Sequence, residues 1–89
     1  MKSLATTRFW LLYSRLPEAV RNLADKNYEL WQKDTRHPSL HFGKVKGSQE
    51  LYSIRIGAHY RAVARVKGDV AQWVWIGTHE EYNRLVSQR

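Results

Sequence analysis

The stretch from Leu51 to Tyr82 constrains the fold most, because apolar and polar residues alternate through most of it. Alternation of this kind indicates β-strands that are buried on one face. Residues 57–59 (Gly-Ala-His) interrupt the pattern, and a three-residue loop that contains glycine is suited to a β-hairpin. The stretch therefore predicts two antiparallel strands, over residues 51–56 and 60–66.

The three-residue loop also determines how the two strands pair. It places Ile56 opposite Tyr60 on an apolar face and Arg55 opposite Arg61 on the other face. Two like charges opposite each other repel, so a purely structural sheet gains nothing from this pair. Two interpretations remain open. The arginines form a solvated basic face, or they are a pair of bidentate donors directed at one phosphate.

A second turn lies between Lys67 and Val70. A two-residue loop of Gly68 and Asp69 puts glycine at the first central position, as a type II′ turn requires. This loop sets large residues against small ones on one face: Trp73 and Trp75 beside Ala62 and Ala64. A three-residue loop would move both tryptophans to the arginine face. We predict the two-residue loop because large and small side chains then pack together.

The composition fits one small domain that spans residues 1–89. The chain is 43% hydrophobic and contains four tryptophans, which argues against disorder. It contains no cysteine, so disulfides and cysteine-based zinc sites are excluded. The first ten residues contain no apolar run long enough for a signal peptide or a membrane span, and we expect a cytoplasmic protein.

The charge balance favours an anionic partner. The formal net charge is +7 and the pI is about 10.1, which suits RNA, DNA, an acidic protein or an anionic membrane surface. The basic residues are scattered over the whole chain rather than gathered in one run. This distribution argues against a disordered basic tail.

The N-terminal third predicts two helices that meet at Pro17. Thr7 fits an N-cap, and apolar residues recur after it at spacings of three and four. Pro17 favours the first position of a second helix, which continues to about Lys33. The apolar stripe of this second helix has one polar member, Asn27. Residues 2–5 are too few to assign and leave room for a brief edge strand.

We expect these two helices to form a hairpin of helices. They carry four aromatic residues at helical spacing: Trp10, Tyr13, Tyr28 and Trp31. Aromatic residues in such positions are more often part of a core than platforms on which nucleic-acid bases stack. We therefore assign all four to the core.

The middle of the chain predicts one more strand, from Leu40 to Lys46. Lys44 and Lys46 share one side of it, where they either protect a sheet edge or extend a cationic surface. His37 and His41 have the spacing of a metal pair on a helix, but a proline lies between them. We expect no metal here, because that helix is improbable and no third ligand follows.

The last segment predicts a helix that begins at Thr78 and ends near Ser87. Thr78 and Glu81 have the spacing of a capping box directly after a strand. His79 lies in the first turn and borders the arginine face. It is either an exposed first-turn residue or a proton-transfer group beside a phosphate site.

The order of these elements resembles the RelE/ParE superfamily of toxins from bacterial type II toxin–antitoxin modules, and its RelE/YafQ-like branch in particular. Three segments carry the resemblance: LWQKDTRHPSL, YSIRIGAHYRAVARV and WIGTHEEYNRL. The resemblance implies an α+β fold. In this fold an N-terminal helical hairpin packs on a mostly antiparallel sheet of three or four strands, and a short helix ends the chain.

The resemblance also implies a function. It implies a cognate antitoxin and cleavage of messenger RNA in the ribosomal A site without a cofactor or metal, by transfer of the phosphate to the 2′-hydroxyl. The site residues it implies are Arg55 and Arg61 for the phosphate, His79 as acid or base, and Tyr82 as a weaker candidate. Further RNA-binding candidates are Lys44, Lys46, Arg65, His59 and His41, and the two histidines could also add a second proton-transfer group.

Two alternatives stay open beside this interpretation. No carboxylate matches the catalytic glutamate of YoeB-like members, and Glu80 and Glu81 fit helix capping better. ParE-type members of the superfamily act on DNA gyrase. The chain could therefore be a gyrase-inhibiting toxin, or a binding module of the same fold that catalyses nothing.

Overall fold

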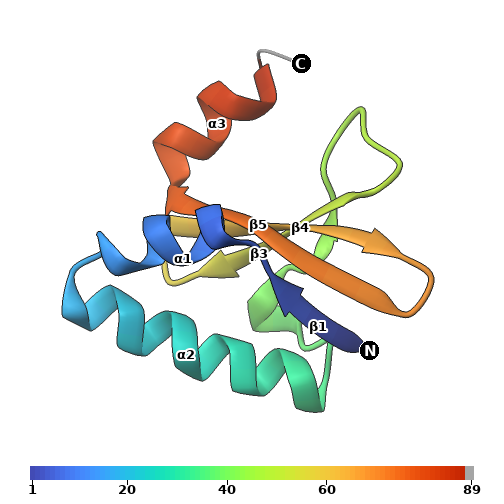
Figure 1. Cartoon of the computed structure of the whole chain (residues 1–89), viewed down its shortest axis with the longest axis horizontal. Helices are drawn as coiled ribbons and strands as arrows, with labels where there is room; N and C mark the ends of the chain where they lie inside the picture. Colours follow the sequence, from blue (N-terminus) through green and yellow to red (C-terminus); the bar gives the residue numbers. More distant parts are fainter. Residues whose placement is uncertain (88–89) are drawn as a thin grey trace.

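The computed structural model describes residues 1–87 and consists of a five-stranded sheet with helices on both sides (Figure 1). The elements are β1 (Lys2–Ala5), α1 (Thr7–Ser14), α2 (Glu18–Lys33), the 3-10 helix η1 (Pro38–Leu40), β2 (Gly43–Lys44), β3 (Leu51–Ile56), β4 (Tyr60–Lys67), β5 (Val70–Thr78) and α3 (His79–Ser87). Helices α1 and α2 cover one side of the sheet, and α3 rises on the other (Figure 1). The predicted α+β class is confirmed.

The sheet is larger and less uniform than predicted. Its strand order is β1-β5-β4-β3-β2, with five strands instead of three or four. The additional edge strand, β1, lies parallel to β5, with Lys2 beside Val70 and Ala5 beside Trp73. Four residues are too few to show a period, and their partner lies almost at the other end of the chain. For that reason the sequence alone could not decide whether residues 2–5 form a strand.

Both predicted turns are confirmed. Ile56 pairs with Tyr60 and Arg55 pairs with Arg61. Gly57 has a φ of +61°, and a Cβ there would come within 2.7 Å of a Leu23 methyl carbon. The backbone angle therefore favours glycine at this position, and any other residue would also have to displace the Leu23 methyl group. The two-residue turn places Lys67 opposite Val70.

The predicted orientation of Trp75 is wrong. Val63 pairs with Trp75 while the next residue, Ala64, pairs with Trp73, so Val74 is an extra residue in β5. Such a β-bulge reverses the face of every side chain beyond it. Trp73 stays on the core face at 5% exposure. Trp75 turns to the arginine face, where its ring lies 6.4 Å from that of Tyr82.

The helices begin close to where they were predicted. The N-cap of α1 is Thr6 rather than Thr7, and its side-chain oxygen accepts a hydrogen bond from the Phe9 backbone N–H at 3.1 Å. Pro17 is the N-cap of α2 rather than its first residue, and α2 ends at Lys33 as predicted. Asn27, the polar residue of the apolar stripe, donates its side-chain N–H to the Arg55 carbonyl at 2.9 Å.

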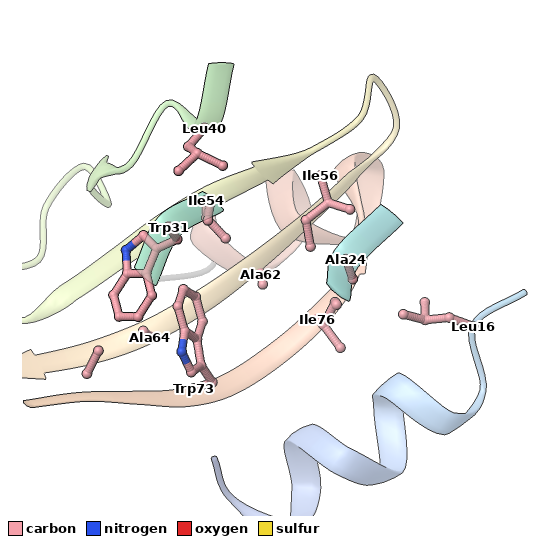
Figure 2. Packing of buried hydrophobic residues seen from close by; sticks show 11 residues of the cluster. Leu16, Ala24, Trp31, Leu40, Ile54, Ile56, Ala62, Ala64, Trp73 and Ile76 are labelled. Atoms are coloured by element: carbon pink, nitrogen blue, oxygen red, sulfur yellow. The ribbon is translucent and has the colours of Figure 1, made fainter. Parts of the chain in front are cut away.

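The core lies between the helical hairpin and the sheet (Figure 2). Trp31 of α2 is fully buried, and its ring meets that of Trp73 edge-on at 5.3 Å. Small residues on β4 make room for these rings, with Ala62 at 3% and Ala64 at 0% exposure. The remaining buried members of this cluster are Leu16, Ala24, Leu40, Ile54, Ile56, Ala71 and Ile76.

Two of the four helical aromatic residues are not in the core. Trp10 is 54% exposed and Tyr28 is 37% exposed, so their assignment to the core was wrong. Both line an apolar groove of about 370 Å³ between α1, α2 and the sheet. Leu4 of β1, which is 60% exposed, also lines this groove. Helical spacing therefore selected the correct face of the helices, but that face is only partly covered.

The strand predicted from Leu40 to Lys46 is mostly wrong. η1 occupies its beginning and buries Leu40, and only Gly43–Lys44 forms a strand. His41 lies between them with a φ of +49°, in the left-handed region. An extended strand is impossible through such a residue, and the chain turns there.

Within residues 1–87, each helix is too short or too polar to cross a bilayer.

Candidate active-site cleft

A cleft of about 270 Å³ opens on the side of the sheet away from the core. Its lining comes from the loop after η1, the β3–β4 hairpin and the first residue of α3: His41, Arg55, Gly57, Ala58, Tyr60, Arg61 and His79. Four of the residues selected from the sequence thus lie together. They are separated by as many as 38 positions in the chain, from His41 to His79.

The two arginines of the cleft are held by different acceptors. Arg55 donates its Nε–H to the Gly57 carbonyl at 2.9 Å. Arg61 donates from one terminal nitrogen to the Ser53 hydroxyl at 3.2 Å, and its guanidinium carbon lies 5.2 Å from the centroid of the Tyr82 ring. These contacts fix the two cations separately and offset part of their mutual repulsion. The remaining N–H groups are available to an anion.

His79 is fixed at the cleft by the predicted capping box, which is confirmed. The Glu81 backbone N–H donates to the Thr78 hydroxyl oxygen at 3.1 Å, and the Thr78 backbone N–H donates to the Glu81 carboxylate at 2.9 Å. Hydrogen bonds from the Thr78 backbone and hydroxyl hold the pKa of Glu81 below its ordinary value. The His79 backbone N–H also donates to the His59 carbonyl at 2.7 Å. This hydrogen bond joins the first residue of α3 to the loop between β3 and β4.

His41 brings a second imidazole to the cleft from the other direction. Its left-handed backbone is uncommon for a residue with a side chain, although histidine is among the residues that tolerate it. Conformations of this kind gather at functional sites, where the surrounding structure holds them in place. Among residues 1–87, those that line the cleft thus supply two guanidinium and two imidazole groups and no carboxylate.

Other predicted residues lie outside the cleft lining. His59 lies in the hairpin loop with an exposed side chain, and Lys44 and Lys46 are exposed near the β2 edge of the sheet. Arg65 lies four residues beyond Arg61, roughly 13 Å along the strand. There it forms an ion pair of 3.1 Å with Glu50. The candidate catalytic residues Arg55, Arg61 and His79 therefore lie in the cleft, and these other predicted residues lie outside its lining.

Tyr82 and Ser53 lie directly behind the cleft. Ser53 is 5% exposed and is the one buried polar side chain among residues 1–87. Its hydroxyl oxygen accepts from Arg61 and, at 3.4 Å, from the Tyr82 hydroxyl. Neither Ser53 nor Tyr60, which lines the cleft, was predicted from the sequence to have a role. The alternating pattern did place Ser53 on the arginine face, and this placement is the sequence feature from which its role could have been inferred.

Metal ligands do not gather in the part of the chain that the structure describes. Within residues 1–87, no three histidine, cysteine, aspartate or glutamate side chains are close enough to hold a metal ion. His37 instead uses its ring nitrogen to contact the Ser39 hydroxyl at 2.8 Å.

Comparison with known proteins identifies the family and agrees with this fold. Residues 18–84 match the family model of the ParE-like toxin domain. A chain of the RelB–RelE antitoxin–toxin complex from Methanococcus jannaschii has 22% identity and a TM-score of 0.75, with coverage of 92% of this chain and 96% of that chain. The YoeB/ParE toxin from Agrobacterium tumefaciens has 21% identity and a TM-score of 0.70, with coverage of 89% and 99%.

The isolated RelE toxin from E. coli has 20% identity and a TM-score of 0.67, with coverage of 98% of this chain and 96% of that chain. A search of curated proteins found no match. At these identities the structural likeness shows a shared fold. Together with the family match, it confirms the resemblance to the RelE/ParE superfamily, whereas the RelE/YafQ-like branch stays a prediction.

Proposed function

This chain belongs to the family of ParE-like toxin domains, and we propose that it is the toxin of a type II toxin–antitoxin system that cleaves messenger RNA on the ribosome. The observation that carries the proposal is the cleft, in which Arg55, Arg61, His41 and His79 line one space of about 270 Å³. A toxin that only binds needs no such gathering of proton-transfer groups and cations. The proposal places the protein in the cytoplasm, where messenger RNA is translated.

The cleft has the groups that cleavage by phosphate transfer requires. The RNA 2′-oxygen loses its proton and attacks the neighbouring phosphorus, which forms a 2′,3′-cyclic phosphate. The bond from phosphorus to the 5′-oxygen breaks, and this oxygen takes up a proton. His41 and His79 are the candidates for proton acceptor and donor. Arg55 and Arg61 stabilise the charge that develops on the phosphate oxygens.

The basic surface beside the cleft is proposed to hold the RNA backbone. Arg65 lies on the Arg61 face farther along β4, and Lys44 and Lys46 are exposed near the β2 edge of the sheet, where Lys44 pairs with Tyr52. Contacts of this kind are largely independent of sequence and weaken as salt concentration rises. They would add affinity to a reaction whose chemistry lies in the cleft.

We also propose a partner, an acidic antitoxin protein. The relatives of known structure include RelB–RelE antitoxin–toxin complexes, and a net charge of +7 favours an acidic partner. The groove lined by Leu4, Trp10 and Tyr28 offers exposed apolar surface on the helical side. Apolar side chains of the antitoxin would fill it, because surface of this kind on a small domain is rarely left uncovered.

The test is 5′-end mapping of a defined messenger RNA in a reconstituted translation reaction. We expect new ends at regular positions within codons that require both the protein and ribosomes. Arg61→Ala and His79→Ala should each lower the cleavage rate by roughly 100-fold, the usual size of a lost charge contact or proton-transfer group. Arg8→Ala removes an equal charge from the exposed surface of α1 and should leave the rate unchanged.

Gyrase inhibition is the second candidate, because the family model that matches is ParE-like. This function uses the same fold and basic surface but no proton transfer. A His79→Ala variant that keeps full toxicity, together with inhibition of supercoiling by the purified protein, would favour gyrase and contradict the nuclease proposal. Toxicity that His79→Ala abolishes would favour the nuclease.

A further inference from the structure

We propose that Ser53 is a positioning residue whose buried hydroxyl holds Arg61 and Tyr82 in place, so that Arg61 meets the phosphate in one fixed orientation. The inference rests on the proposed function, because it assigns further residues to the same cleft. It makes Ser53 the link between strands β3 and β4 and helix α3, the elements that build the cleft.

The first step is the burial of the Ser53 hydroxyl. Ser53 is 5% exposed, and buried hydroxyl groups are nearly always hydrogen-bonded. Its two donors come from other elements, Arg61 of β4 at 3.2 Å and Tyr82 of α3 at 3.4 Å. A hydroxyl that served only strand pairing would not need two side-chain donors. Here both donors are residues that adjoin the cleft.

The second step concerns Tyr82. Its hydroxyl is directed at Ser53, and the ring lies under the Arg61 guanidinium at 5.2 Å and beside the His79 ring at 6.3 Å. Tyr82 is absent from the cleft lining, whereas Arg61 and His79 belong to it. We therefore give Tyr82 a positioning role in place of proton transfer. It is the platform on which the phosphate-binding cation lies.

The third step is the state of Arg61 before RNA binds. An unrestrained arginine has many rotamers, and here a second cation, Arg55, lies directly opposite on the next strand. The bond to Ser53 and the contact with the Tyr82 ring hold one orientation and leave the other guanidinium N–H groups free for a bidentate contact. Orientation that is fixed in advance lowers the barrier of the chemical step.

The experiment compares Ser53→Ala with Ser53→Thr and Ser3→Ala in ribosome-dependent cleavage under single-turnover conditions. Ser53→Ala should lower the rate at saturating ribosome roughly tenfold, which equals about 1.4 kcal/mol, with little change in the half-saturating ribosome concentration. Ser53→Thr should recover most of the rate, because it keeps the hydroxyl and suits a strand.

Ser3→Ala is the matched control. The Ser3 hydroxyl also accepts from a side chain, the Trp73 indole N–H at 3.1 Å, but on the core side of the sheet. It should lower the melting temperature without changing the cleavage rate. If rate followed melting temperature across both alanine variants, the role of Ser53 would be structural and the inference would be wrong.

A second comparison tests whether Ser53 acts through Arg61. In an Arg61→Lys background, which keeps a cation but not the guanidinium fork, Ser53→Ala should cost little further rate. A further tenfold loss in that background would overturn the inference, because the effect would not depend on the guanidinium.

A third measurement is independent of nuclease activity. The Arg61 side-chain N–H signal is followed by NMR during titration with inorganic phosphate. It should be sharp and should shift on binding in the wild-type protein, and it should be broadened and respond more weakly in Ser53→Ala. Identical signals would overturn the inference. If wild-type protein cuts no messenger RNA while this NMR difference is present, the proposed function fails and the positioning role stands.

Discussion

Replacement of Gly77 by alanine should destabilise the protein and displace helix α3 at the same time. Gly77 is buried in β5, directly opposite Arg61. A Cβ at this position would lie 2.7 Å from a ring carbon of Trp75 and 2.9 Å from a carboxylate oxygen of Glu81. Separations this short do not occur between real atoms of these kinds, so both the ring and the carboxylate must move. Trp75 packs against Tyr82, and Glu81 closes the capping box.

The size of the effect follows from these two neighbours. Overpacking against the Trp75 ring costs about 1–3 kcal/mol, and loss of a helix cap costs about 1 kcal/mol. The free energy of unfolding should therefore fall by about 2–4 kcal/mol, a large share of the roughly 5–15 kcal/mol of a typical domain. For a domain of this size the melting temperature should fall by roughly 10–25 °C.

The assay is urea denaturation followed by tryptophan fluorescence, since the chain contains four tryptophans. Gly43→Ala is the control, because a Cβ there meets no atom within 4 Å. It should leave the stability unchanged or raise it by about 0.5 kcal/mol, through the unfolded chain. If the two variants differed by less than about 0.5 kcal/mol, the steric argument at Gly77 would be refuted.

Three further predictions concern helix ends and the groove. Thr6→Ala should lower the free energy of unfolding by about 1 kcal/mol while Thr7→Ala should not, because the Thr6 oxygen caps α1; equal losses in urea denaturation would contradict this cap. Glu81→Gln should be less stable than the wild type near neutral pH. The difference should shrink as pH falls below about 4.3, because the lowered pKa of Glu81 gives stability that is present above the unfolded value and lost on protonation. Urea midpoints of the two proteins, measured near neutral pH and below about pH 4.3, would disprove this prediction if the difference between the midpoints stayed constant. Trp10→Ala should weaken binding of the cognate antitoxin at least tenfold in calorimetry and leave mRNA cleavage unchanged, since exposed tryptophans often dominate interfaces. If the affinity of the Trp10→Ala variant for the antitoxin were unchanged, the antitoxin would bind outside this groove.

The features that the sequence predicted correctly depend on residues close together in the chain. A three-residue loop determines that Arg55 faces Arg61, and the spacing of Thr78 and Glu81 determines where α3 begins. From these two local features follows a face that carries arginines with a histidine at its border. Strand alternation and capping chemistry are sufficient to reach half of the cleft.

The missed features depend on distant residues. Strand β1 pairs with residues almost 70 positions later, from Lys2 to Val70. The Ser53 hydroxyl finds its donors 8 and 29 positions away. His41 was a candidate from the sequence, but the left-handed backbone with which it lies in the cleft lining was not predicted. No local sequence pattern predicts contacts of this kind, because they form only when the sheet and the helices pack together.

The bulge at Val74 makes the predicted orientation of Trp75 wrong, and it also supports the site. A regular β5 would put Trp75 beside Trp73 on the core face, as large-against-small packing predicted. The extra residue instead turns Trp75 to the arginine face, where it gives Tyr82 an aromatic neighbour. Tyr82 in turn lies against Arg61 and bonds to Ser53. In a regular β5, Val74 and Ile76 would face the arginines instead of Trp75, and Tyr82 would lack this aromatic neighbour. The irregular strand therefore keeps Ile76 in the core and turns Trp75 toward α3, the helix that carries the cleft residue His79.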